Sequence, residues 1–104
     1  MTAFNIVRMC VKPGFEQEYL DFHSNRALSE MKGMKALRVV RTGERQYHVV
    51  GEWTDMAALV AARPQMIALL DTFRDKLEDL GGDLGVTEPW SGEAVVDRVA
   101  APVA

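Results

Sequence analysis

The spacing of apolar and polar positions changes along the chain from the period of a β-strand to that of an α-helix and back. Residues 46–53 form a β-rich run that ends at Trp53, and the Thr54-Asp55 pair behind it is a typical helix start. This run therefore predicts a central strand that passes directly into a helix.

The segments on either side of this run show the same two periods. Residues 4–11 are nearly continuously apolar and lead into a Lys-Pro-Gly turn. The complete pattern predicts strands over 4–11, 34–42, 46–53 and 93–99, and helices over 15–31, 56–62 and 64–80. Pro64 should kink or break the last two helices apart, because proline disfavours helical geometry at the residue before it.

The resulting βαββαβ order predicts an α+β domain of the ferredoxin-like kind, a four-stranded antiparallel sheet with both helices on one face. No internal repeat or linker is visible, so we expect a single domain over 1–104, with its core at about 4–97 and a frayed tail at 100–104. The strands carry apolar side chains in both phases, as at Val49 and Val50. We therefore expect a second copy of the chain to cover the open sheet face, giving a homodimer.

The composition limits the classes of partner. Hydrophobic residues make up 48% and charged residues 26%, as in an ordinary globular protein, and the net charge is −3. We therefore expect neither nucleic acid, which favours a strongly basic domain, nor a membrane, which requires a long apolar run. The single cysteine, Cys10, and the lack of a signal-peptide pattern predict a cytoplasmic protein.

Two residues of the first predicted helix are candidates for catalysis. His23 and Arg26 lie one turn apart, on or beside its apolar stripe, where a charge requires a partner or a pocket. A neutral His23 can take a proton from a phenol, and Arg26 can stabilise the phenolate or an oxyanion product. Alternatively, His23 is half exposed and Arg26 pairs with a carboxylate.

Five further residues are candidates for a substrate pocket. Trp53 can form a wall for an aromatic substrate or anchor the core, and Trp90 can close over the pocket mouth or pin its own loop. His48 can face either the pocket or the dimer interface. Arg63 can border a cleft or form a salt bridge, and Asn5 can hydrogen-bond a substrate carbonyl or its neighbours in the strand.

Two local motifs occur in the same order in a known family: the strand–Lys-Pro-Gly–helix opening at 11–15 and the Gly-Glu-Trp-Thr-Asp junction at 51–55, followed by a helix. Over roughly residues 4–97 the chain resembles the antibiotic-biosynthesis-monooxygenase-like family of dimeric α+β barrels. The resemblance implies a pocket in each subunit, between the sheet and the two helices.

Members of that family differ in their chemistry. Some oxidise polycyclic aromatic phenols to quinones with molecular oxygen and without metal or flavin, and others degrade haem. The haem-degrading members resemble this chain at Asn5, but their second tryptophan and haem-ligating histidine would fall near Ala62 and Thr72. The resemblance therefore implies a small monooxygenase that acts on an aromatic or polyketide-like phenol without a cofactor or a metal.

A second interpretation remains open beside this one. The sequence contains no complete catalytic triad, metal-ligand cluster or pair of catalytic carboxylates. A non-catalytic dimeric module that binds a small apolar ligand or a partner would explain the same residues. The two hypotheses differ in what they expect of the pocket: an open cavity that His23 or Arg26 faces favours the enzyme, and a filled one favours the module.

Overall fold

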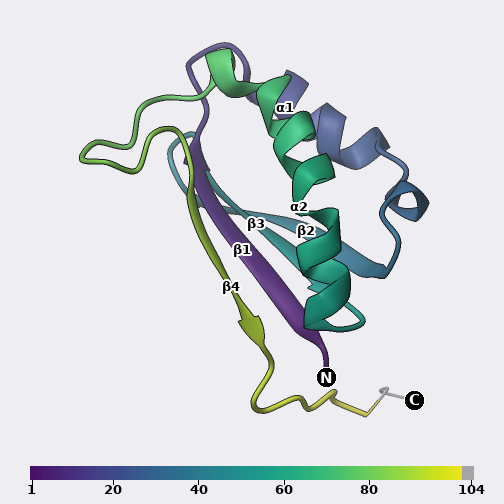
Figure 1. The fold of residues 1–104 in the computed structure, drawn as a ribbon. Helices are drawn as coiled ribbons and strands as arrows, with labels where there is room; N and C mark the ends of the chain where they lie inside the picture. Colours follow the sequence, from purple (N-terminus) through teal and green to yellow (C-terminus); the bar gives the residue numbers. More distant parts are fainter. Residues whose placement is uncertain (102–104) are drawn as a thin grey trace.

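The computed structural model describes residues 1–101. It is an α+β structure in which one antiparallel sheet, in the order β2-β3-β1-β4, is covered on one face by both α-helices (Figure 1). The elements are β1 (Ala3–Cys10), α1 (Glu16–Asn25), a 3₁₀ turn η1 (Leu28–Glu30), β2 (Met34–Gly43), β3 (Gln46–Trp53), α2 (Met56–Asp71), a 3₁₀ turn η2 (Arg74–Lys76) and β4 (Glu88–Glu93). The predicted ferredoxin-like fold is confirmed. The frayed tail expected at 100–104 lies mostly outside the described residues.

The two central strands decide which side chains face the helices. β1 pairs with β3 from Ala3 opposite Trp53 to Cys10 opposite Gln46, and paired residues of an antiparallel sheet point to the same face. In β3 every second residue is buried, beginning with Tyr47, so this set lies under the helices. The alternate set, which includes His48, lies on the face that no helix covers.

The core beneath the helices has two parts. One cluster packs under α1 and contains Met9, Val11, Tyr19, Tyr47, Val49, Phe73 and Leu77. The other packs under the first half of α2 and contains Ala3, Met31, Trp53, Leu59 and Ala62. Members of both clusters line the cavity described in the next subsection.

The first helix is shorter than its apolar stripe predicted. α1 ends at Asn25 instead of continuing to 31, and Arg26 already has extended backbone angles. Ser24 and Asn25 favour this end, because their side chains compete for backbone hydrogen bonds. The chain then makes the short η1 turn and reaches Gly33, whose positive φ of 87° and close approach to Ala58 require a glycine.

The second helix begins as predicted but is not interrupted by proline. The Asp55 carboxylate accepts a hydrogen bond of 2.8 Å from the Ala58 amide, as a helix cap does. α2 then continues through Pro64 to Asp71, so the predicted break is wrong. The carbonyl that Pro64 cannot bond is that of Val60, which is exposed, and water can satisfy it there. Burial of Leu59 and Ala62 against the sheet stabilises the helix around this point.

The C-terminal part differs most from the sequence prediction. The helix expected over 64–80 ends at Asp71, because Leu77 is needed in extended form, where it pairs with Val11 and is buried in the core. The last strand is β4 at Glu88–Glu93 and not 93–99. Its pairing with β1 begins at Arg8 opposite Glu88, whereas the valines at 95, 96 and 99 are exposed.

Candidate functional site

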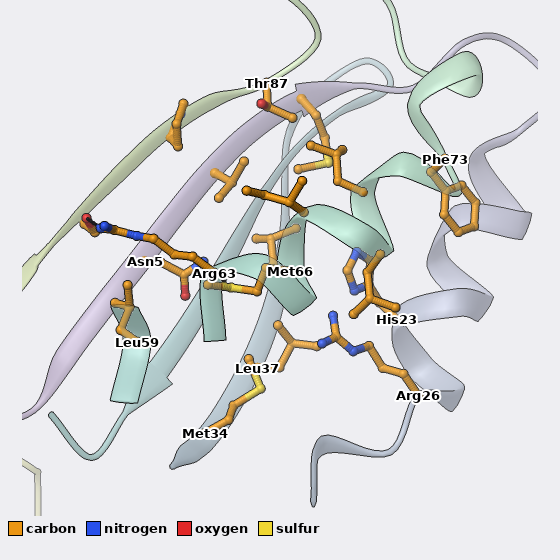
Figure 2. A pocket seen from close by; sticks show the side chains of 18 of the residues that line it. Asn5, His23, Arg26, Met34, Leu37, Leu59, Arg63, Met66, Phe73 and Thr87 are labelled. Atoms are coloured by element: carbon orange, nitrogen blue, oxygen red, sulfur yellow. Dashed lines mark hydrogen bonds between the residues drawn. The ribbon is translucent and has the colours of Figure 1, made fainter. Parts of the chain in front are cut away.

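A cavity of about 400 Å³ lies between the helix-covered face of the sheet and the two helices (Figure 2). Most of its wall is apolar. The apolar lining residues are Val7, Met9, Phe22, Met34, Leu37, Val49, Leu59, Met66, Ile67, Leu69, Leu70, Phe73 and Pro89. The polar or aromatic-polar ones are Asn5, Tyr19, His23, Arg26, Arg63, Thr87, Trp90 and Ser91. Such a cavity suits a small, largely apolar ligand.

His23 stands on the α1 wall of the cavity. Its ring packs edge-on against Tyr19 at 4.8 Å and Phe22 at 5.1 Å between ring centroids. Its Nδ1 is buried and has no hydrogen-bond partner among residues 1–101. Burial, helped by the positive charge of Arg26, lowers the pKa of His23 to about 4. The imidazole is therefore neutral at neutral pH.

Arg26 follows at the end of α1 and lies beside His23 in Figure 2. Its Nη2 donates to the Met31 sulfur at 3.3 Å, and its guanidinium lies 5.8 Å from the centre of the Phe22 ring. Burial lowers the pKa of Arg26, although Glu30 acts against this. No ion pair of Arg26 forms within residues 1–101. An arginine stays protonated in proteins, so this half-buried positive charge favours an anion in the cavity.

Asn5 is oriented from beneath the cavity by Trp53. The Nε1 of Trp53 donates a hydrogen bond of 2.7 Å to Oδ1 of Asn5. Because an indole N–H can only donate, Asn5 must turn its oxygen towards Trp53, and this fixes its amide nitrogen on the other side. That nitrogen lies 3.8 Å from the Met66 sulfur, a weak acceptor. It is a donor available to a ligand.

Arg63 borders the cavity at the side opposite to Arg26 (Figure 2). It projects from α2 and donates a hydrogen bond of 3.0 Å from Nη2 to Oγ of Ser91 in β4. This contact links the helix to the edge strand beside the cavity. Ser91 is neutral, so the charge of Arg63 is not compensated by it.

Trp90 has a position that neither sequence interpretation describes fully. It borders the cavity, but it pairs with Ile6, and this register directs its side chain to the helix-free face of the sheet. There it is 50% exposed and contributes to a shallow hollow with Phe4 and Ile6.

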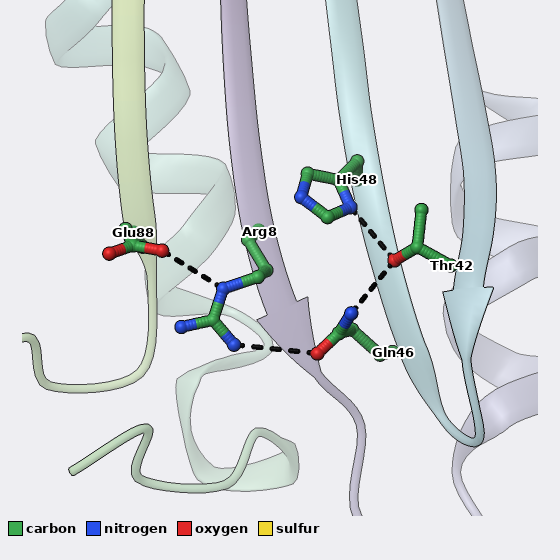
Figure 3. A network of polar contacts seen from close by, with 5 residues as sticks. All are labelled: Arg8, Thr42, Gln46, His48 and Glu88. Atoms are coloured by element: carbon green, nitrogen blue, oxygen red, sulfur yellow. Dashed lines mark hydrogen bonds and ion pairs between the residues drawn. The ribbon is translucent and has the colours of Figure 1, made fainter.

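Trp53 and His48 are not among the residues that line the cavity, which rules out the pocket alternative that the sequence left open for each. Trp53 is 0% exposed in the core cluster under α2 and acts on the cavity only through Asn5. His48 lies on the opposite face of the sheet, where its Nδ1 is 2.8 Å from the Thr42 hydroxyl (Figure 3). The same network joins Thr42 to Gln46, Gln46 to Arg8, and Arg8 to Glu88.

The sequence prediction missed three hydroxyl-bearing residues of the cavity, Tyr19, Thr87 and Ser91. Thr87 and Ser91 precede the last strand predicted at 93–99, because that valine-rich segment resembles a strand more closely than Glu88–Glu93 does. The position of Ser91 follows from the pairing of β4 with β1. Ser91 pairs with Asn5, so its side chain faces the helices.

Residues 1–101 contain no group of three or more histidine, cysteine, aspartate or glutamate side chains that could hold a metal ion. Within the same residues, no helix is both long enough and apolar enough to cross a membrane.

Comparisons with known proteins identify the fold. No protein-family model and no curated protein matches the chain. Among solved structures, a protein of unknown function from Nitrosomonas europaea is 22% identical, with a TM-score of 0.71, and the match covers 97% of this chain and 96% of that one. SnoaB from Streptomyces nogalater, a cofactor-independent oxygenase, is 17% identical, with a TM-score of 0.69 and coverage of 92% and 95%.

A third match is MhuD from Mycobacterium tuberculosis, a haem degrader solved with two haems in its active site. It is 20% identical, with a TM-score of 0.63 and coverage of 93% and 99%. Other matches carry the name antibiotic biosynthesis monooxygenase, including one from Chloroflexus aurantiacus. The chain thus has the fold of the antibiotic biosynthesis monooxygenases, and the resemblance inferred from its motifs is confirmed at the level of the fold.

Two residues that the resemblance associates with haem binding are absent from this chain. At the two positions where the resemblance placed the second tryptophan and the haem-ligating histidine, the chain has Ala62 and Thr72. Ala62 is packed in the core, and the Thr72 hydroxyl donates to the Leu69 carbonyl at 2.6 Å at the end of the helix. Neither supplies a ligand for iron.

Proposed function

We propose that the protein is a cofactor-independent monooxygenase that binds an aromatic or polyketide-like phenol in the cavity and oxidises it with molecular oxygen. The observation that carries the proposal is the pairing of a neutral histidine, His23, with an arginine, Arg26, on one wall of an apolar cavity. Oxygenation without a cofactor needs an electron-rich phenolate. A proton acceptor and a cation that stabilises the phenolate are therefore the minimum requirement.

The two residues would act together on the phenol. A histidine with a pKa of about 4 is a weak base towards a free phenol. In the complex, the phenolate that forms lies beside both groups, and its negative charge raises the affinity of His23 for the proton. Arg26 stabilises the phenolate directly, and it does so strongly because the apolar wall excludes water. Asn5 can donate its amide N–H to a second oxygen of the substrate.

The proposed reaction balances without a further reactant. The phenolate transfers electrons to dioxygen, and a C–O bond forms at a ring carbon that carries hydrogen. The O–O bond then breaks. One oxygen atom remains as the new carbonyl of the quinone, and the other leaves as water with the two hydrogen atoms that the phenol has lost. Phenol and dioxygen thus give quinone and water.

Oxygen consumption with a panel of polycyclic phenols tests this function, with quinone formation followed by absorbance. We expect uptake with at least one phenol, and a loss of about 10²-fold or more in kcat/KM for Arg26→Met, since the stabilising charge is removed. Arg74→Met is the matched control, because Arg74 lies outside the cavity and pairs with Asp71. Equal loss in the two variants, or no uptake with any phenol, would contradict the proposal.

A ligand-binding module without catalysis is the second candidate. The lowered pKa of His23 favours it, because this histidine is a poor base until an acidic ligand is bound. Binding of aromatic phenols without oxygen consumption would support the module against the enzyme.

We also propose a homodimer formed through the helix-free sheet face. Apolar side chains are accessible there on three strands, as Ile6, Val40 and Trp90 show by their exposure of 37%, 46% and 50%. Packing this face against a second copy of the chain would remove these apolar side chains from water. We further propose that the protein is cytoplasmic, because its single cysteine suits a reducing compartment.

A further inference from the structure

The charges on the cavity wall are all of one sign. Arg26 and Arg63 are the only lysine, arginine, aspartate or glutamate residues among its lining residues. Neither forms an ion pair within residues 1–101: Arg26 bonds to a methionine sulfur and Arg63 to a serine hydroxyl. The remaining wall is mainly apolar, so two positive charges face a space that offers them no counterion.

The two arginines approach the cavity from opposite sides. Arg26 comes from the end of α1 and lies beside Leu37 of β2, whereas Arg63 comes from α2 and contacts Ser91 of β4 (Figure 2). β2 and β4 are the two edge strands of the sheet. These two strands are three strand spacings apart, roughly 14 Å. The two guanidinium groups share no hydrogen-bond partner and lie on opposite sides of the cavity, so an elongated molecule suits them better than a single anionic group.

Arg26 and Arg63 also differ in their surroundings. Arg26 is half-buried, so an anion beside it is little screened by water, whereas Arg63 is exposed at the mouth. Asn5 is on β1, which lies between β2 and β4 across the sheet, and its amide nitrogen can donate a hydrogen bond to a ligand. The cavity therefore has a deep cationic end, a central hydrogen-bond donor and an outer cationic end.

We propose that the physiological ligand is an elongated, flat aromatic molecule with an acidic group at each end, one bound by Arg26 and the other by Arg63. This inference rests on the proposed function for the idea that the ligand is aromatic, and it narrows the substrate class to dianionic or readily ionised aromatic acids. The apolar walls contact the rings, and the phenolic oxygen or carboxylate at the deep end lies beside Arg26 and His23.

Binding of three probes of equal ring size tests the inference. They are a naphthalene dicarboxylate with its acids at the two far ends, the hydroxynaphthoate that keeps one carboxylate, and the dihydroxynaphthalene that has none. Titration followed by naphthalene fluorescence at neutral pH gives the three dissociation constants. We expect the dicarboxylate to bind about tenfold more tightly than the monocarboxylate, and the uncharged probe to bind most weakly.

Variants of the two arginines show where each acid binds. Arg63→Met should remove the advantage of the dicarboxylate over the monocarboxylate and leave the uncharged probe unchanged. Arg26→Met should weaken both acids. Arg74→Met changes the net charge equally and should affect none of them, since it lies outside the cavity. Equal affinity for all three probes, or equal losses in Arg63→Met and Arg74→Met, would overturn the inference.

The outcomes separate this inference from the proposed function. If the phenol panel gives no oxygen uptake but the dicarboxylate is preferred through both arginines, the oxygenase proposal fails and the ligand class stands. If uncharged phenols are oxidised while the dicarboxylate has no preference, the oxygenase stands and the dianionic ligand is rejected.

Discussion

The indole N–H of Trp53 donates a hydrogen bond of 2.7 Å to the side-chain oxygen of Asn5, across the pair of central strands β3 and β1. Trp53 is fully buried, and Asn5 lies on the cavity wall. The tryptophan that marks the end of the central strand therefore influences the candidate site without touching a ligand. It decides that Asn5 presents a donor, and not an acceptor, to the cavity.

Replacing the indole should show this effect. Trp53→Phe keeps an aromatic ring but removes the N–H, so the Asn5 oxygen loses its partner and the amide is free to turn. We expect a loss of about 1–3 kcal/mol in the free energy of unfolding, measured by urea denaturation. We also expect weaker binding of carbonyl-bearing aromatic probes. Unchanged stability and unchanged probe binding would show that the hydrogen bond does not orient Asn5.

Gly51 tests the same contact from the opposite side. It pairs with Asn5 in the sheet, and a Cβ atom at this position would overlap the Asn5 side-chain oxygen. Gly51→Ala should therefore displace Asn5 and destabilise the fold, by about 1–3 kcal/mol if the hydrogen bond to Trp53 is lost. Gly92→Ala is the matched control in β4, since a Cβ there meets no atom within 4 Å. Similar unfolding curves for the two variants would contradict this account.

The burial of His23 makes stability depend on pH. Its pKa is lowered from 6.5 to about 4 in the folded state, so the unfolded chain binds the proton first as the pH falls. The folded state should lose stability between about pH 6.5 and 4, by on the order of 3 kcal/mol, and the loss should be absent in His23→Gln.

Denaturation at several pH values, with the variant compared to the wild type, isolates this contribution from that of the carboxylates. Tyr19, Phe22 and Arg26 surround the imidazole, and of these only Arg26 carries a charge at these pH values. His48→Gln is the control, because this histidine lies on the other face of the sheet. A wild-type profile parallel to that of His23→Gln would refute the prediction.

The proposed dimer can be tested on the helix-free face. Ile6 lies at the middle of β1 and is 37% exposed there. Ile6→Lys would place a charge in the interface without a partner, and this should convert the dimer to a monomer. Val60→Lys makes an equivalent change on the solvent side of α2, where Val60 is 46% exposed, and should not alter the mass. Light scattering after size-exclusion chromatography measures the molecular mass of both variants and of the wild type. A wild-type monomer at micromolar concentration would exclude the dimer.

Local signals in the sequence were sufficient for much of the fold. Residues 46–53 form β3, and the Asp55 cap starts α2, because strand alternation and helix capping depend on residues that are neighbours in the chain. The spacing of His23 and Arg26 also brought them close together, although Arg26 is the residue at which α1 ends. The alternation of β3 further required His48 and Trp53 to point to opposite faces of the sheet.

Only the tertiary structure decided which face is which, and where the later elements begin and end. Packing of α1 and α2 on the face of Trp53 buried that residue and left His48 outside the cavity. Contacts with the sheet carried α2 through Pro64, and pairing of Leu77 with Val11 ended the helical region early. β4 lies where it can pair with β1, some eighty residues away in the chain, and no local pattern contains that information. The sequence by itself determined the periods and the caps, because these are local. Long-range packing determined the cavity and the side chains that face it.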